Sequence, residues 1–103
     1  GIIDRNGMGL DAFTEETMRL EPLADKWRAF NWQVHECDGH DLAALVSTFD
    51  NLPADSDKPQ MIIAHTIKGK GVKYMENSRL WHLGYLHGED AKRTVDEILA
   101  YEA

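Results

Sequence analysis

The fold is decided by the stretch Gln60-Met61-Ile62-Ile63-Ala64-His65-Thr66, which has a continuous apolar run of strand length at its centre. An apolar run that does not alternate with polar residues is typical of a strand covered on both faces, as in a parallel sheet. Immediately afterwards, Lys68-Gly69-Lys70-Gly71 interrupts regular structure. We therefore predict a buried strand of a parallel sheet over residues 60–66.

Two more strands are expected on the N-terminal side of this one. Gly1-Ile2-Ile3 has the composition of the end of a buried strand, and residues 32–37 alternate as a strand does. A sheet of only three such strands would leave a long apolar edge, which favours association. The chain is therefore expected to form part of a larger sheet.

Apolar residues at helical spacing predict helices between and after the strands. The expected ranges are Glu21–Asn31, Leu42–Phe49 and Glu89–Tyr101. Asp38 or Asp41 is expected to cap the second helix, and Thr14 to cap a short helical turn that it begins. Because strands alternate with helices, the sequence predicts an α/β fold built on a parallel sheet.

Composition and charge exclude several classes of function. The chain has 103 residues and a net charge of −7, with acidic residues spread along it, which argues against nucleic-acid binding through phosphates. No stretch approaches the ~20 apolar residues that span a bilayer, and no basic region leads into an apolar run at the start. A single cysteine, Cys37, fits a reducing compartment, so a cytoplasmic enzyme is expected. The chain opens in mid-pattern without Met, which indicates a processed or truncated polypeptide.

The first candidate site is the loop Asp4-Arg5-Asn6-Gly7-Met8-Gly9-Leu10, directly after the first strand. Ligands of open α/β sheets lie beyond the carboxyl ends of the strands. Asn6 offers an amide oxygen, and Gly7 lets a following carbonyl point inward, which would suit Mg²⁺ shared with a diphosphate. The Asn-Gly pair equally favours an ordinary Asx turn without metal, and the loop taken alone favours that turn.

Two later loops are further candidates. Residues 65–71 hold glycines and lysines that could approach a phosphate or could form a tight turn with solvated lysines, and they lack the P-loop pattern. Residues 72–88 form a long loop with aromatic and His residues, and such loops often carry function, although a lone His is more often structural. His35 and Cys37 share one strand face, but without a CxxC or HExxH motif we expect no zinc site and a buried Cys37.

Three separated segments together resemble the N-terminal half-subunit of split transketolases. They are residues 4–11, 21–41 and 63–82, in matching order and spacing over nearly the whole chain. The resemblance implies a parallel-sheet, Rossmann-like domain that holds the diphosphate end of thiamine diphosphate. Residues 1–103 would be the C-terminal portion of this domain, because the Gly-Asp-Gly that begins the family motif is absent.

The resemblance also implies roles for individual residues. Asn6 matches the Asn that gives a side-chain oxygen to Mg²⁺, and Met8 matches the position that gives a backbone carbonyl to the same ion. Leu10 and Lys68 match positions that line the cofactor. His82 matches the catalytic His that reaches the cofactor diphosphate and the donor sugar, with His87 as a rival in the same loop.

By the same resemblance, the chain is part of a transketolase that moves a two-carbon ketol unit from a ketose to an aldose phosphate, as in the pentose phosphate pathway. Its partners would be the rest of the diphosphate-binding domain and a pyrimidine-binding subunit or domain, in a heterotetramer, with the isolated chain inactive and no nucleic acid or membrane involved. Arg5 and Leu83–Gly88 depart from the commonest family pattern, which leaves the sugar and subfamily open. The alternatives are another thiamine-diphosphate enzyme, such as a deoxyxylulose-phosphate synthase or a specialised-metabolism transketolase, and a non-catalytic assembly module.

Overall fold

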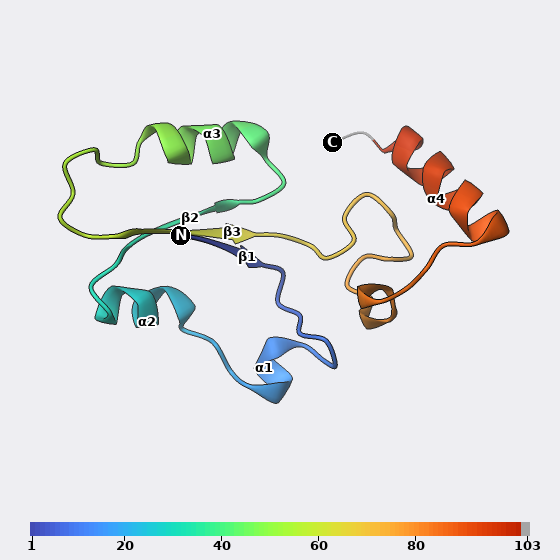
Figure 1. The fold of residues 1–103 in the computed structure, drawn as a ribbon, viewed down its shortest axis with the longest axis horizontal. Coiled ribbons are helices and arrows are strands. Elements are labelled where there is room, and N and C mark those ends of the chain that lie inside the picture. Colours follow the sequence, from blue (N-terminus) through green and yellow to red (C-terminus); the bar gives the residue numbers. More distant parts are fainter. Residues whose placement is uncertain (102–103) are drawn as a thin grey trace.

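A computed structural model describes residues 1–101 and shows a parallel three-stranded sheet with helices on both faces (Figure 1). The strands are β1 (Ile2–Arg5), β2 (Gln33–Asp38) and β3 (Gln60–His65). Their order in the sheet is β1-β3-β2, and β3 pairs in parallel with both neighbours. The α/β class and the parallel sheet predicted from the sequence are confirmed.

β3 is the central strand and forms the core of the sheet. Met61, Ile62, Ile63 and Ala64 are each at most 6% exposed. They are covered because the helices α2 (Leu23–Ala29) and α3 (Leu42–Asp50) lie on opposite sides of the sheet, as the edge-on view in Figure 1 shows. Burial of each large aliphatic side chain stabilises the fold by roughly 1.5–3 kcal/mol, so this strand holds the sheet together.

β1 and β2 form the two edges of the sheet among the residues that the structure describes. Ile2 on β1 is 62% exposed, which leaves apolar surface at that edge. Cys37 lies on β2 as expected, but it is only partly buried. The prediction of a buried Cys37 is therefore wrong, because an edge strand is covered less completely than β3.

The helices match their expected ranges apart from shifts at their ends. α2 ends at Ala29, two residues early, because Asn31 adopts a φ of 65° that no helix continues. Asp41 caps α3, since its carboxylate accepts hydrogen bonds from the N–H groups of Ala43 and Ala44 at 2.9 and 3.0 Å. Of the two candidate caps, Asp41 is thus the correct one.

Thr14 was expected to cap a helical turn, and this prediction is wrong. Thr14 is instead the first residue of the short helix α1 (Thr14–Thr17), and Phe13 occupies the N-cap position without a side-chain cap bond. The Thr14 hydroxyl is engaged elsewhere, because it accepts a hydrogen bond from Arg5 and lies 3.3 Å from the carbonyl oxygen of Gly7.

The C-terminal third lies beyond the carboxyl ends of the strands and is organised around Tyr74. It holds a 3-10 helix, η1 (Arg79–His82), in the loop expected to lack regular structure, and the helix α4 (Gly88–Ala100). The Tyr74 ring packs edge-on against Trp81 at 5.3 Å, and the Arg93 guanidinium lies 4.3 Å from the ring centre on the α4 side. These contacts join η1 to α4 through one aromatic ring.

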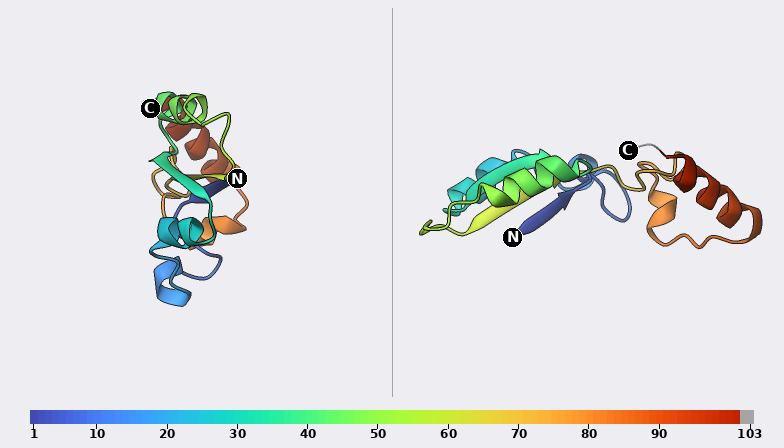
Figure 2. Two further views of the ribbon diagram at one scale, coloured as in Figure 1. Left: turned by 90° about the vertical axis from the view of Figure 1, so that its left-hand side faces the viewer. Right: turned by 90° about the horizontal axis from the view of Figure 1, so that it is seen from above.

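The molecule is flat and open, with extents of 52 × 32 × 16 Å (Figure 2). Its radius of gyration is 16.6 Å, whereas a compact domain of this length has about 13 Å. Several large apolar side chains are more than three-quarters exposed: Phe30, Leu42, Leu80 and Leu99. Within residues 1–101, no helix has the length and apolar character needed to cross a membrane.

Candidate functional site

Hydrogen bonds between loops hold the carboxyl ends of the three strands together. The Thr66 hydroxyl, after β3, donates to the carboxylate of Asp4 on β1. The backbone N–H of Ile67 donates to Nε2 of His40, after β2, at 2.7 Å. The three loops therefore form one surface at the edge where open α/β sheets bind their ligands.

The loop after β1 makes a closed turn around Asn6. Oδ1 of Asn6 accepts a hydrogen bond from the N–H of Met8 at 2.9 Å, and Gly7 between them has a φ of 74°. The Gly7 carbonyl accepts the N–H of Thr14 at 2.9 Å, and Met8 lies opposite Phe13 in an antiparallel bridge. The Asx turn expected from the Asn-Gly pair is present.

Two oxygen atoms of this turn retain acceptor capacity. Oδ1 of Asn6 uses one of its two lone pairs for Met8, and the Met8 carbonyl accepts no hydrogen bond from residues 1–101. Mg²⁺ prefers oxygen ligands and commonly shares its coordination with phosphates, so these atoms fit such an ion. The turn and the metal site are therefore compatible with each other.

Within residues 1–101, no nearby cluster of side chains offers further ligands to a cation. Among the described residues, no group of three or more His, Cys, Asp or Glu side chains could hold a metal ion. A cation at Asn6 and Met8 would therefore take its other ligands from a bound phosphate, from water or from polypeptide beyond these residues.

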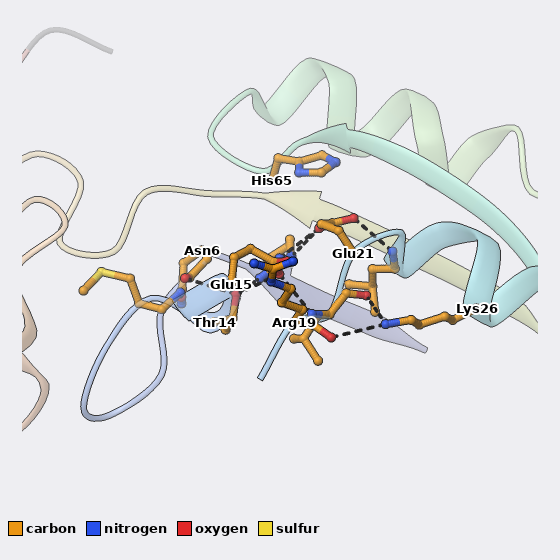
Figure 3. A network of polar contacts seen from close by, with 12 residues as sticks. Asn6, Thr14, Glu15, Arg19, Glu21, Lys26 and His65 are labelled. Atoms are coloured by element: carbon orange, nitrogen blue, oxygen red, sulfur yellow. Dashed lines mark hydrogen bonds and ion pairs between the residues drawn. The ribbon is translucent and has the colours of Figure 1, made fainter. Parts of the chain in front are cut away.

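Arg5 anchors the Asn6 turn to the segment that carries Thr14, Glu15 and Glu21, which are labelled in Figure 3. Its side chain is only 10% exposed, and its Nη1 donates to the Thr14 hydroxyl at 2.8 Å. Its Nη2 contacts the carboxylates of Glu15 and Glu21 at 3.0 and 2.8 Å, and its Nε donates to Glu21 as well. This role was not predicted from the sequence. The available signal was a cation at a strand end followed by two acidic residues in the next segment.

Both carboxylates of this network favour their charged form. The N–H of Leu20 lowers the pKa of Glu15 below its ordinary value, and Arg5 lowers it further. The N–H of Leu23 and then the Arg5 guanidinium lower the pKa of Glu21 in the same direction. The ion pairs with Arg5 are therefore intact at neutral pH.

The loop after β3 presents Lys68 in a fixed turn. The Lys68 carbonyl accepts a hydrogen bond from the N–H of Asn77 at 2.9 Å. The Lys68 ammonium takes part in no hydrogen bond or ion pair with residues 1–101. Gly69 has a φ of 78°, and a Cβ there would lie 2.5 Å from the Met75 carbonyl oxygen, so only glycine fits. Leu10, on the Asn6 loop, is half exposed.

The two candidate histidines lie in the C-terminal third. His82 ends η1 and His87 occupies the N-cap position of α4, and both are exposed. The structure brings η1 beside residues 11–16, which follow the Asn6 loop. The Arg79 guanidinium donates to the Asp11 carbonyl, and a hollow of about 550 Å³ lies between residues 12–16 and residues 77–80. Within residues 1–101, neither His is hydrogen-bonded to the Asn6 loop.

Comparisons with known proteins agree with this arrangement. Residues 1–102 match the family described as "Transketolase, thiamine diphosphate binding domain". The chain is 41% identical to a subunit of the apulose-4-phosphate transketolase of Phocaeicola vulgatus, over 94% of this chain and 34% of that protein. It is 42% identical to 6-deoxy-6-sulfo-D-fructose transketolase subunit SqwG of Clostridium sp., over 92% of this chain and 34% of that protein.

A third relative, the corresponding apulose-4-phosphate transketolase subunit from Actinobacillus succinogenes, is 34% identical over 94% of this chain and 35% of its own length. The chain thus spans about a third of the length of these relatives. The family match covers nearly every residue, and the parallel sheet accords with it. The chain belongs to the transketolase family, and residues 1–102 match its thiamine diphosphate binding domain.

Proposed function

We propose that this chain is the C-terminal portion of the diphosphate-binding domain of a transketolase subunit that transfers a two-carbon ketol unit from a ketose to an aldose. The Asn6 turn is the observation that supports this most directly. It lies at the carboxyl end of β1 and offers the amide oxygen of Asn6 and the carbonyl of Met8 to a hard cation. The family match supplies the cofactor to which such a cation would be bound.

Each expected site residue has a proposed task. The oxygens of Asn6 and Met8 would bind Mg²⁺, and the Lys68 ammonium would offset negative charge on the diphosphate. Leu10 would give apolar contact to the cofactor, and His82 would donate a hydrogen bond to the diphosphate or to a sugar oxygen. Thiamine diphosphate, when bound, supplies the electron sink that lets the carbon–carbon bond beside a carbonyl break and form.

We further propose that the chain is inactive in isolation and that it works as part of a cytoplasmic heterotetramer. Three of the relatives are named as transketolase subunits, which supports the existence of a partner subunit, here one that binds the pyrimidine of the cofactor. The chain covers about a third of those relatives, so the Gly-Asp-Gly part of the domain would come from polypeptide outside it. The flat shape and exposed apolar residues favour such an assembly.

The substrate has a second candidate. The names of the relatives mention apulose 4-phosphate and 6-deoxy-6-sulfo-D-fructose, two different sugars. This observation favours a transketolase of specialised sugar metabolism over one limited to the common pentose phosphates.

The test uses the complete subunit, bound to its partner and stripped of cofactor and metal. Ketol transfer is followed from a panel of ketoses, phosphorylated and sulfonated, to an aldose phosphate. We expect product only when thiamine diphosphate and Mg²⁺ are both restored. An assembly that forms but binds no thiamine diphosphate would instead support a non-catalytic assembly module.

A further inference from the structure

The side chain of Arg5 is largely buried, whereas the two carboxylates that it contacts, those of Glu15 and Glu21, are partly exposed. It lies one residue before Asn6, and its partners are Thr14, Glu15 and Glu21, from α1 and the segment leading to α2 (Figure 3). A guanidinium taken out of water is destabilising unless its hydrogen bonds are satisfied. Arg5 can therefore stay in place only while α1 is folded back against the end of β1.

A chain of hydrogen bonds connects Arg5 to the backbone of the turn. Nη1 of Arg5 donates to the Thr14 hydroxyl at 2.8 Å, and that hydroxyl lies 3.3 Å from the Gly7 carbonyl, which also accepts the N–H of Thr14 at 2.9 Å. The hydroxyl carries one proton, and the Glu15 carboxylate at 3.4 Å is the more distant acceptor. Thr14 thus links the guanidinium to the Gly7 peptide group.

The Gly7 carbonyl is engaged by Thr14, whereas the next carbonyl, that of Met8, has no donor among residues 1–101. With Gly7 bonded to Thr14, and the N–H of Met8 bonded to Asn6, the Met8 carbonyl accepts nothing from residues 1–101. The same contacts keep Oδ1 of Asn6 within the turn at 2.9 Å from the Met8 nitrogen. The two oxygens assigned to the cation therefore belong to a turn that the contact between Arg5 and Thr14 helps to hold.

We propose that Arg5 is a positioning residue for the cation site, which acts through Thr14 to shape the Asn6-Gly7-Met8 turn. The inference rests on the proposed function and deepens it, because it names the residue that prepares the metal ligands. Arginine suits this task, since its planar fork serves Thr14 and two carboxylates at once. A lysine offers a point charge without that geometry.

The experiment uses the complete subunit with its partner. Binding of thiamine diphosphate is measured by calorimetry over a series of Mg²⁺ concentrations, for the wild type and for Arg5→Lys. Residues that orient metal ligands typically change metal affinity by about 10–100-fold, so the Mg²⁺ concentration for half-maximal binding should rise by that factor. The matched control is Arg28→Lys, because Arg28 is half exposed and pairs with Asp25 on the surface of α2. We expect no shift for the control.

A milder pair of variants protects the test against a folding defect. Thr14→Val removes the hydroxyl and should shift the Mg²⁺ dependence of cofactor binding in the same direction. Thr14→Ser keeps the hydroxyl and should show the Mg²⁺ dependence of the wild type. For all shifted variants, turnover at saturating Mg²⁺ and cofactor should change less than the apparent cofactor KM, as expected for lost binding.

The outcomes separate this inference from the proposed function. Suppose that the wild type binds cofactor and that Arg5→Lys and Thr14→Val show the same Mg²⁺ dependence of binding as Arg28→Lys. The positioning role of Arg5 is then overturned, and the proposed function is not. A wild type that binds no thiamine diphosphate overturns the proposed function and this inference with it. Shifted Mg²⁺ dependence without any ketol transfer supports the role of Arg5 and contradicts only the proposed reaction.

Discussion

The cation ligands proposed for Asn6 and Met8 come from different parts of the residue, a side-chain amide oxygen and a main-chain carbonyl oxygen. Asn6→Ala removes its ligand atom, whereas Met8→Leu leaves the carbonyl in place. In the assembled enzyme, Asn6→Ala should weaken Mg²⁺-dependent cofactor binding by roughly 10–100-fold, because a ligand is lost and nearby dipoles are left unpaired. Met8→Leu should be mild. Equal losses in a calorimetric titration would mean that Asn6 serves only as a turn residue.

His82 and His87 can be distinguished by their kinetics. Loss of one donor that acts chiefly in the transition state lowers the rate by on the order of 10²–10³. We expect His82→Ala to lower turnover, to raise the KM for the donor sugar, or both, at saturating cofactor and Mg²⁺, while His87→Ala stays near normal. A crippled His87→Ala beside an active His82→Ala would show that the assignment of this loop is shifted.

At this scale, the sequence predicted the turn but not the contacts that hold it. The Asn6-Gly7 pair and the Asp41 cap are local features, since each makes its hydrogen bonds within three residues. Arg5 contacts Glu15 and Glu21 across ten and sixteen residues. Such contacts depend on how α1 folds back against the strand, and no periodicity in the sequence encodes that path.

At the scale of elements, the segment from β1 to α2 should be sensitive to acid. Glu15 and Glu21 have pKa values lowered below the ordinary 4.5, so their contribution to stability is complete above that pH and is lost as pH falls through the folded pKa. The midpoint of urea unfolding of the complete subunit should therefore decrease below about pH 4.5. Glu21→Gln should flatten this decrease, and an unchanged pH profile for that variant would contradict the role of the ion pairs.

The elements themselves were predictable to different degrees. β3 was recognised from its apolar run because burial on both faces demands such a run. η1 was missed because its Trp81 packs on Tyr74 at 5.3 Å, a tertiary contact that compensates for a weak local pattern. The end of α2 was predicted too late, because apolar residues keep their helical spacing up to Phe30. The helix itself ends at Ala29, and the backbone turns at Asn31.

At the scale of the whole molecule, residues 1–103 should not behave as an independent domain. The radius of gyration exceeds that of a compact chain, and large apolar side chains are exposed on α3, on α4 and at Phe30, just after α2. The isolated chain should associate in sedimentation, melt without a cooperative transition, and bind thiamine diphosphate weakly or not at all. A stable monomer with a sharp thermal transition would contradict this expectation.

The register of the sheet also has a consequence for the order of folding. Gln33 on β2 pairs with Gln60 on β3, whereas Ile2 on β1 pairs with Ile62, across more than twice as much sequence. Closing the longer loop carries the larger entropic penalty and slows pairing, so β2 and β3 should associate before β1 docks. Pulse-labelled hydrogen exchange should then find the amide of Ile62, which donates to the Gly1 carbonyl, protected later than that of Gln33, which donates to the Pro59 carbonyl. During synthesis, β1 leaves the ribosome before β3 yet waits for it, and the Asn6 turn attached to β1 is among the last parts of this segment to take shape.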